Sequence, residues 1–127
     1  MAFVKFEDIE AWKRGHALVL AVYRLTAEGL FRKDRGLCDQ IQRASVSITS
    51  NIAEGYARRG NKEFAKFLWI AKGSAAEVQS QLHVALALGY ISKDQFDFLY
   101  NEANLIQVHL FRLIQSLASD INRQKIS

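Results

Sequence analysis

The 127-residue sequence contains no proline, and its apolar residues recur at steps of three and four. Proline is the residue that most strongly interrupts a helix, and a period near 3.6 places these apolar side chains on one helical face. The pattern is therefore typical of long amphipathic helices. Strands have little support, because alternation of apolar and polar residues is scarce. The sequence predicts an all-α fold.

Four helices are predicted, at about residues 7–28, 37–57, 62–88 and 93–123. The connections between them are short, which makes consecutive helices antiparallel neighbours. A chain of this length is long enough to bury a core as one domain. We therefore expect residues 1–127 to form a single antiparallel, up-down-up-down four-helix bundle.

Local signals mark several helix ends. Gly29 is placed to take the left-handed conformation that ends the first helix. Asn61 is the expected N-cap of the third helix. Ser92 has Gln95 three residues later, which is the capping-box spacing and predicts the start of the fourth helix.

Each predicted helix carries one apolar stripe for the core. In the first helix the stripe is Ile9, Trp12, His16, Val19 and Tyr23. In the second it is Leu37, Ile41, Ala44, Ile48 and Ile52. The third has Phe64, Phe67, Leu68, Ala71, Ala75, Val78, Leu82, Ala85 and Leu86. The fourth has Phe96, Leu99, Ala103, Ile106, Leu110, Leu113, Leu117 and Ile121.

Further apolar residues lie outside these stripes: Leu18, Val22, Leu25, Trp69, Ile70, Phe98, Leu105, Val108 and Phe111. A small bundle rarely needs so many, and surplus apolar surface usually has a partner. The simplest partner is a second copy of the chain, so we expect a homo-oligomer. The second helix is also rich in short polar residues, namely Ser45, Ser47, Thr49, Ser50 and Asn51. These fit either close helix packing inside the bundle or a subunit interface.

Composition narrows the class of protein. Half of the residues are hydrophobic, which excludes a disordered chain. No apolar run approaches the roughly 18 residues needed to span a bilayer, and the first residues lack the layout of a signal peptide. The single cysteine, Cys38, is expected to be a small buried side chain. These features predict a soluble cytoplasmic protein with no membrane partner.

Charge is concentrated in the middle of the chain. Residues 43–72 contain six Lys/Arg and two Asp/Glu, whereas residues 73–122 contain two and five. Basic residues interleaved with aromatic ones suit single-stranded nucleic acid, because cations bind phosphates and rings stack on bases. The expected phosphate contacts are Arg43, Arg58, Arg59, Lys62 and Lys66, and the expected stacking ring is Tyr56 or Trp69. The alternative is an ordinary solvated face whose aromatic rings belong to the core.

Catalysis has little support. His16, His83 and His109 lie on separate helices without metal-ligand spacing, and no glutamate has a histidine three residues later, as a di-iron bundle requires. There is no glycine-rich phosphate loop. We expect no catalytic residue, no metal and no cofactor. An enzyme would need Glu54 and Glu77 together in a core pocket; capping, pairing with arginine or an interface position is the favoured role for both.

Several short sequence motifs resemble those of a known family: residues 6–13 (FEDIEAWK), 36–44, 50–56 (SNIAEGY), 62–64, 67–68, 73–77 and 88–90. Over about residues 3–115 the chain resembles the four-helix-bundle proteins encoded by intervening sequences within bacterial 23S rRNA genes, a ribosomal-protein-like family. Thr49 and the Phe31-Arg32 pair stand where that family often has proline. The departure at Phe31-Arg32 predicts a looser first connection.

The resemblance implies a bacterial cytoplasmic protein without known catalysis that assembles as a homo-oligomer, with a pentamer expected. The family is similar to the accessory proteins of diversity-generating retroelements, basic pentamers that bind nucleic acid and a reverse transcriptase. The expected partners are therefore RNA or a ribonucleoprotein. The alternative is a protein scaffold that docks a polymerase or ribosomal partner without touching nucleic acid.

Overall fold

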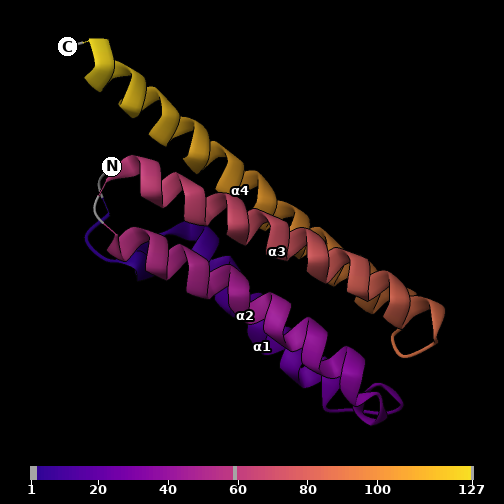
Figure 1. The fold of residues 1–127 in the computed structure, drawn as a ribbon. Helices are drawn as coiled ribbons and strands as arrows, with labels where there is room; N and C mark the ends of the chain where they lie inside the picture. The colour runs from indigo at the N-terminus through magenta and orange to yellow at the C-terminus, as the bar shows by residue number, and fades with distance from the viewer. Residues whose placement is uncertain (1–2, 59, 127) are drawn as a thin grey trace.

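A computed structural model describes the backbone of residues 3–58 and 60–126, and the side chains of 3–58 and 60–123. Its elements are η1 (Phe6–Asp8), α1 (Glu10–Thr26), η2 (Phe31–Lys33), α2 (Arg35–Ala57), α3 (Asn61–Ala87) and α4 (Lys93–Ile126). No strand occurs within these ranges, and the all-α prediction is confirmed. Figure 1 shows each helix running opposite to the one before it, with α1 and α2 on one side and α3 and α4 on the other.

The first helix starts later than predicted. Phe6–Asp8 forms a separate 3-10 turn, and Ile9 then has extended backbone with φ −73° and ψ 122°. The α-helix therefore begins at Glu10, and the Ile9 carbonyl accepts its first hydrogen bond, from the Lys13 amide at 3.1 Å. At the other end the helix stops at Thr26, and Gly29 takes the predicted positive φ, +57°.

The capping predictions had different outcomes. The Ser92 hydroxyl accepts a hydrogen bond from the Gln95 amide at 3.1 Å, and the Gln95 carboxamide accepts one from the Ser92 amide at 2.9 Å. The predicted capping box is thus confirmed. The N-cap assigned to Asn61 is wrong, because Gly60 occupies that position with φ +102° and Asn61 is the first helical residue. A backbone of this conformation favours glycine over any residue with a Cβ.

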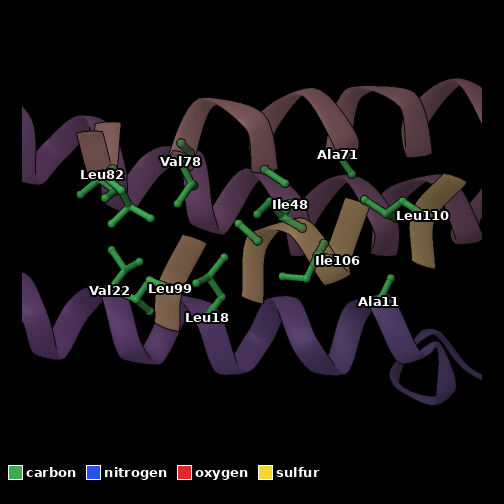
Figure 2. Close-up of a cluster of buried hydrophobic side chains, with 14 of the residues drawn as sticks. Ala11, Leu18, Val22, Ile48, Ala71, Val78, Leu82, Leu99, Ile106 and Leu110 are labelled. Atoms are coloured by element: carbon green, nitrogen blue, oxygen red, sulfur yellow. The ribbon is translucent and has the colours of Figure 1, made fainter. Parts of the chain in front are cut away.

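The core combines side chains from all four helices (Figure 2). The stripes predicted for α2, α3 and α4 are buried or half-buried throughout. The stripe predicted for α1 holds only in part: Ile9 is buried, Trp12 packs half-buried against the core and Val19 is half-buried, but His16 and Tyr23 are exposed. The buried face of α1 is instead Ala11, Gly15, Leu18, Val22 and Thr26.

Close packing explains which face of α1 is buried. A Cβ added at Gly15 would lie 3.0 Å from Cγ2 of Thr49 and 3.2 Å from Cγ2 of Ile48. The small residues of α1 therefore let α2 approach, and the larger residues of the neighbouring face stay outside. Leu18 and Val22, which we counted as surplus apolar residues, belong to the core.

The short polar residues of α2 mostly serve helix packing. Ser45 is fully buried and donates to the Gln42 carbonyl at 2.9 Å. The Ser47 and Ser74 hydroxyls are 2.9 Å apart and join α2 to α3. Asn51 donates to both the hydroxyl and the carbonyl oxygen of Ser47. Only Ser50 in this group is exposed.

Side chains hold together the end of the bundle that contains the α1–α2 and α3–α4 connections, and we call it the fastened end. Asp34 caps α2 by accepting the Leu37 amide at 3.1 Å, and its other carboxylate oxygen accepts the Tyr90 hydroxyl at 3.0 Å. Phe31 is fully buried in η2 and packs against Tyr90 with ring centroids 5.4 Å apart. The aromatic ring thus anchors the first connection in the core, and the prediction that it is looser than in proline-containing relatives stays a prediction.

Candidate nucleic-acid interface

The opposite end of the bundle contains the α2–α3 connection and the first turns of α3, and we call it the basic end. Here α2 and α3 touch closely, since a Cβ added at Gly55 would lie 2.6 Å from the Phe67 Cβ and 3.1 Å from the Phe64 ring. Only hydrogen fits at this position. The contact fixes how α3 leaves the connection and hence where its basic residues point.

Arg58 caps the end of α2 and is held there by its neighbours. Its guanidinium forms an ion pair with Glu54 at 3.0 Å and lies over the Phe67 ring, 5.1 Å from the centroid. Both charged groups remain about half exposed, so the pair contributes little to stability. Arg59 lies outside the described residues.

Lys62, Lys66 and Trp69 are brought together on the outward face of α3. Their spacing of four and three residues places them along one side of the helix. The two lysines are exposed and half of the Trp69 surface is open to solvent. With Glu63 and Ala65 they line a shallow hollow of about 460 Å³. This trio is the part of the predicted site that the fold assembles.

Tyr56 and Arg43 do not join this trio. The Tyr56 hydroxyl donates to the Phe3 carbonyl at 2.7 Å, and its ring packs edge-on against Phe64 with centroids 5.9 Å apart. Tyr56 thus holds the N-terminal segment and has little ring surface to offer. Arg43 is exposed on α2, fifteen residues before Arg58, which is about 22 Å along the helix axis.

Three further residues extend the trio toward α4. The Lys72 ammonium lies 5.7 Å from the Trp69 ring centroid, and Phe111 meets Trp69 edge-to-face with centroids 6.1 Å apart. Lys72, Phe111 and Arg112 also line a second hollow, of about 480 Å³, between α3 and α4. Lys72 follows Trp69 by three residues, so helical spacing alone signals this contact. The contact with Phe111 depends on how α3 and α4 are aligned, which no local pattern reveals.

Glu54 and Glu77, which an enzyme would need together in a core pocket, do not face each other. Ser47 of α2 touches Ser74 of α3, and Glu54 and Glu77 lie in opposite directions from that contact. They are about 15 Å apart along the bundle. Among the described residues, no group of three or more His, Cys, Asp or Glu side chains is arranged to hold a metal ion.

Two groups at the fastened end have shifted titration. Burial raises the pKa of the Cys38 thiol, and the nearby carboxylates of Asp34 and Asp39 raise it further. The thiol is buried and donates to the Phe31 carbonyl at 3.1 Å, so the predicted burial of this cysteine is confirmed. The hydrogen bond to Asp34 raises the pKa of Tyr90. Both groups hold the connections at this end, because the thiol bonds to the backbone of η2 and the phenol bonds to the residue that caps α2.

The fold and this surface define a class: an antiparallel four-helix bundle with a basic, partly aromatic face. In the described part of the chain, no helix is both long and apolar enough to cross a membrane. The sequence model of the 23S rRNA-intervening sequence protein family matches residues 7–112. The chain therefore belongs to that family. The resemblance noted from the sequence is thereby confirmed.

Similarity to solved structures supports the same fold. A protein of unknown function from the S23 ribosomal protein family of Bacteroides thetaiotaomicron superposes with a TM-score of 0.75 at 23% sequence identity. The match covers 82% of this chain and 97% of that one. No curated protein matches the sequence.

Proposed function

We propose that this protein is a non-enzymatic homo-oligomer that binds RNA, alone or within a ribonucleoprotein, through its basic end. The observation that carries the proposal is the exposed trio of Lys62, Lys66 and Trp69. Neither lysine forms an ion pair with any carboxylate of the described residues. Unpaired cations beside an open aromatic ring favour an anionic strand with stackable bases.

The oligomer is supported by apolar side chains that remain at least about two-fifths exposed in the protomer. They include Leu20, Tyr23, Ile70, Val84, Leu88, Phe98 and Leu105. We infer that these side chains, which lie on α1 and α4 and on or directly after α3, are covered in the assembled state. Five subunits is the number implied by the family resemblance. Several copies would also present several basic ends to one RNA, which raises avidity.

The test compares two triple variants with the same change in net charge. One replaces Arg58, Lys62 and Lys66 with Glu at the basic end, and the other replaces Arg32, Lys33 and Arg35 with Glu at the fastened end. Binding of a labelled single-stranded RNA is followed by fluorescence anisotropy at several salt concentrations. The first triple should lower the slope of log affinity against log salt by about 2 for each bound protomer, because about 0.7 is lost per phosphate contact. The second triple should leave the slope near the wild-type value.

Equal slopes for the two triples would show that the basic end does not contact the strand. Light scattering on the same samples gives the number of subunits. A mass near five protomers supports the pentamer, whereas a monomeric mass contradicts the argument from exposed apolar side chains.

A protein scaffold is the second candidate, and the side chain that favours it is Phe98. This ring is 61% exposed beside a groove between α1 and α4 that contains Ala21, Leu25 and Leu99. A reverse transcriptase or ribosomal partner docked there would remain bound after nuclease treatment of a co-purified sample. A partner bridged by RNA would be lost.

A further inference from the structure

We propose that Trp69 and Phe111 form a stacking site for unpaired RNA bases, with Lys72 and Arg112 as additional phosphate contacts. This inference rests on the proposed function and deepens it, because it names the ligand as single-stranded RNA. It also places part of the binding surface on α4, which contains none of the RNA-binding residues predicted from the sequence.

The aromatic pair is built from two helices that are far apart in the sequence. Trp69 comes from the first half of α3 and Phe111 from the middle of α4, and their ring planes are inclined by 69°. The edge of one ring meets a face of the other, and the Lys72 ammonium lies over the Trp69 ring, yet both side chains stay partly open to solvent. The exposed fractions are 50% for Trp69 and 41% for Phe111. The rings of Tyr56 and Phe64 have a similar edge-on geometry, yet Phe64 is buried and Tyr56 half-buried in the protomer.

Cations lie on both sides of the aromatic pair. Lys62 and Lys66 line the hollow on the Trp69 side, and Lys72 and Arg112 line the hollow on the Phe111 side. None of the four forms an ion pair within the part of the chain that the structure describes. Glu63 is the only acidic residue among the described residues that line the two hollows.

The dimensions suit nucleotides. The hollows measure about 460 and 480 Å³, within the range of roughly 300–1,000 Å³ that is usual for small-molecule sites. A strand passing across both hollows would place its phosphates near the cations and its bases near the rings. Alternation of cations with stacking platforms is the usual design of single-strand binding surfaces.

Single-stranded RNA fits this surface better than a duplex or a second copy of the chain. The base faces in an A-form duplex are already stacked on one another, so exposed rings gain little from duplex RNA. A second copy that presents this same face would bury Lys72 and Arg112 against cations of its own, and the subunit count of the variants tests a contact with any other face. Burying unpaired charges is costly, whereas a strand supplies one phosphate per nucleotide.

The direct test uses the fluorescence of Trp69. The chain has two tryptophans, so a Trp12→Phe variant leaves Trp69 as the only one. This variant is titrated with an oligouridylate and, separately, with heparin, a polyanion without bases. Stacking should quench Trp69 with the oligouridylate and leave it nearly unchanged with heparin. Equal quenching by both polymers would overturn the proposal, because charge alone would then explain the signal.

Binding measurements with full-length variants provide a second readout. Trp69→Leu and Phe111→Leu should each weaken oligouridylate binding by about 5- to 150-fold, the range for loss of one stacked base. Trp69→Phe should retain most of the affinity. Leu30→Ala is the control, because Leu30 is a 60% exposed apolar residue of the α1–α2 connection at the other end of the bundle, away from these cations. Lys72→Gln and Arg112→Gln should each lower the salt slope by about 0.7.

The outcomes separate this inference from the proposed function. Suppose that the triple variant at the basic end loses affinity while Trp69→Leu and Phe111→Leu bind as wild type. In that case the stacking site is wrong and the RNA-binding function stands. If oligouridylate does not bind the wild type at all, both fail. If Trp69→Leu or Phe111→Leu changes the subunit count measured by light scattering, the aromatic pair belongs to a contact between copies and the proposal is overturned.

Discussion

The two ends of this bundle differ in how their polar side chains are used. At the fastened end, Asp34 bonds both to the start of α2 and to Tyr90, and Ser92 and Gln95 cap α4. At the basic end, α3 has Gly60 at its N-cap position and no side-chain cap, and Lys62 and Lys66 are exposed to solvent. Polar groups are satisfied internally at one end and left available at the other. Side-chain caps thus hold the fastened end, whereas close packing at Gly55 holds the basic end and leaves Lys62 and Lys66 exposed for the binding that we propose.

The largest expected effect comes from the one tight contact at the basic end. Gly55→Ala should lower the free energy of unfolding by about 2–3 kcal/mol, because its Cβ would lie 2.6 Å from the Phe67 Cβ. Gly73→Ala is the control, since nothing lies within 4 Å of a Cβ there. That variant should gain about 0.5–1 kcal/mol from helix propensity. Urea unfolding at one fixed protein concentration measures both, and a Gly55→Ala protein as stable as wild type would contradict the close packing.

The next effect compares the helix starts at the two ends. Asp34→Ala should cost about 1–2 kcal/mol, because the α2 amide and the Tyr90 hydroxyl both lose their acceptor. Asn61→Ala should change stability by less than about 0.5 kcal/mol, because Asn61 is not the cap of α3. Thermal unfolding of the two variants provides the comparison. Equal losses would mean that the two ends are equally fastened.

A smaller effect concerns pH. The hydrogen bond to Asp34 raises the pKa of Tyr90 above its ordinary value of 10.0. The protonated phenol is favoured in the folded state, so its contribution to stability is complete below about pH 10 and is lost as the pH rises through the folded-state pKa. Tyr90→Phe should therefore be less stable than wild type at neutral pH, and the difference should shrink in alkaline solution. A difference that stays constant up to high pH would exclude this role for the hydroxyl.

The smallest effect concerns the ion pair at the basic end. Glu54→Gln removes the carboxylate that holds Arg58 at 3.0 Å. Because both side chains are about half exposed, stability should change by less than about 1 kcal/mol. RNA affinity should rise by about twofold as Arg58 becomes available to phosphate, which a salt titration with labelled RNA measures. Weaker binding would show that Glu54 orients Arg58 for the strand.

Much of the fold follows from local patterns. The stripes of α2, α3 and α4 could be predicted because each helix has one dominant apolar face. The buried face of α1 was not predicted correctly, because α1 has two adjacent apolar faces. The face that contains the smaller residues, Ala11 and Gly15, is the one that packs into the core. The periodicity of large apolar residues cannot show that the close approach of α1 to α2 favours small side chains.

The candidate site divides in the same way. Lys62, Lys66 and Trp69 are close in sequence on one helix, so their grouping could be predicted from helical spacing. The role of Tyr56 depends on the Phe3 carbonyl, and the position of Phe111 depends on the alignment of α3 and α4. Both are contacts between segments far apart in the chain. Local sequence carries no direct signal for them.

The single cysteine has a practical consequence for experiments in solution. Cys38 is 8% exposed, its thiol is bonded to the Phe31 carbonyl, and burial raises its pKa, so a thiol reagent should label the native protein slowly. The labelling rate therefore reports how often the fastened end opens. A second cysteine introduced at a solvent-facing position would react selectively. Dyes and spin labels can thus be attached at chosen sites while the native cysteine stays in place.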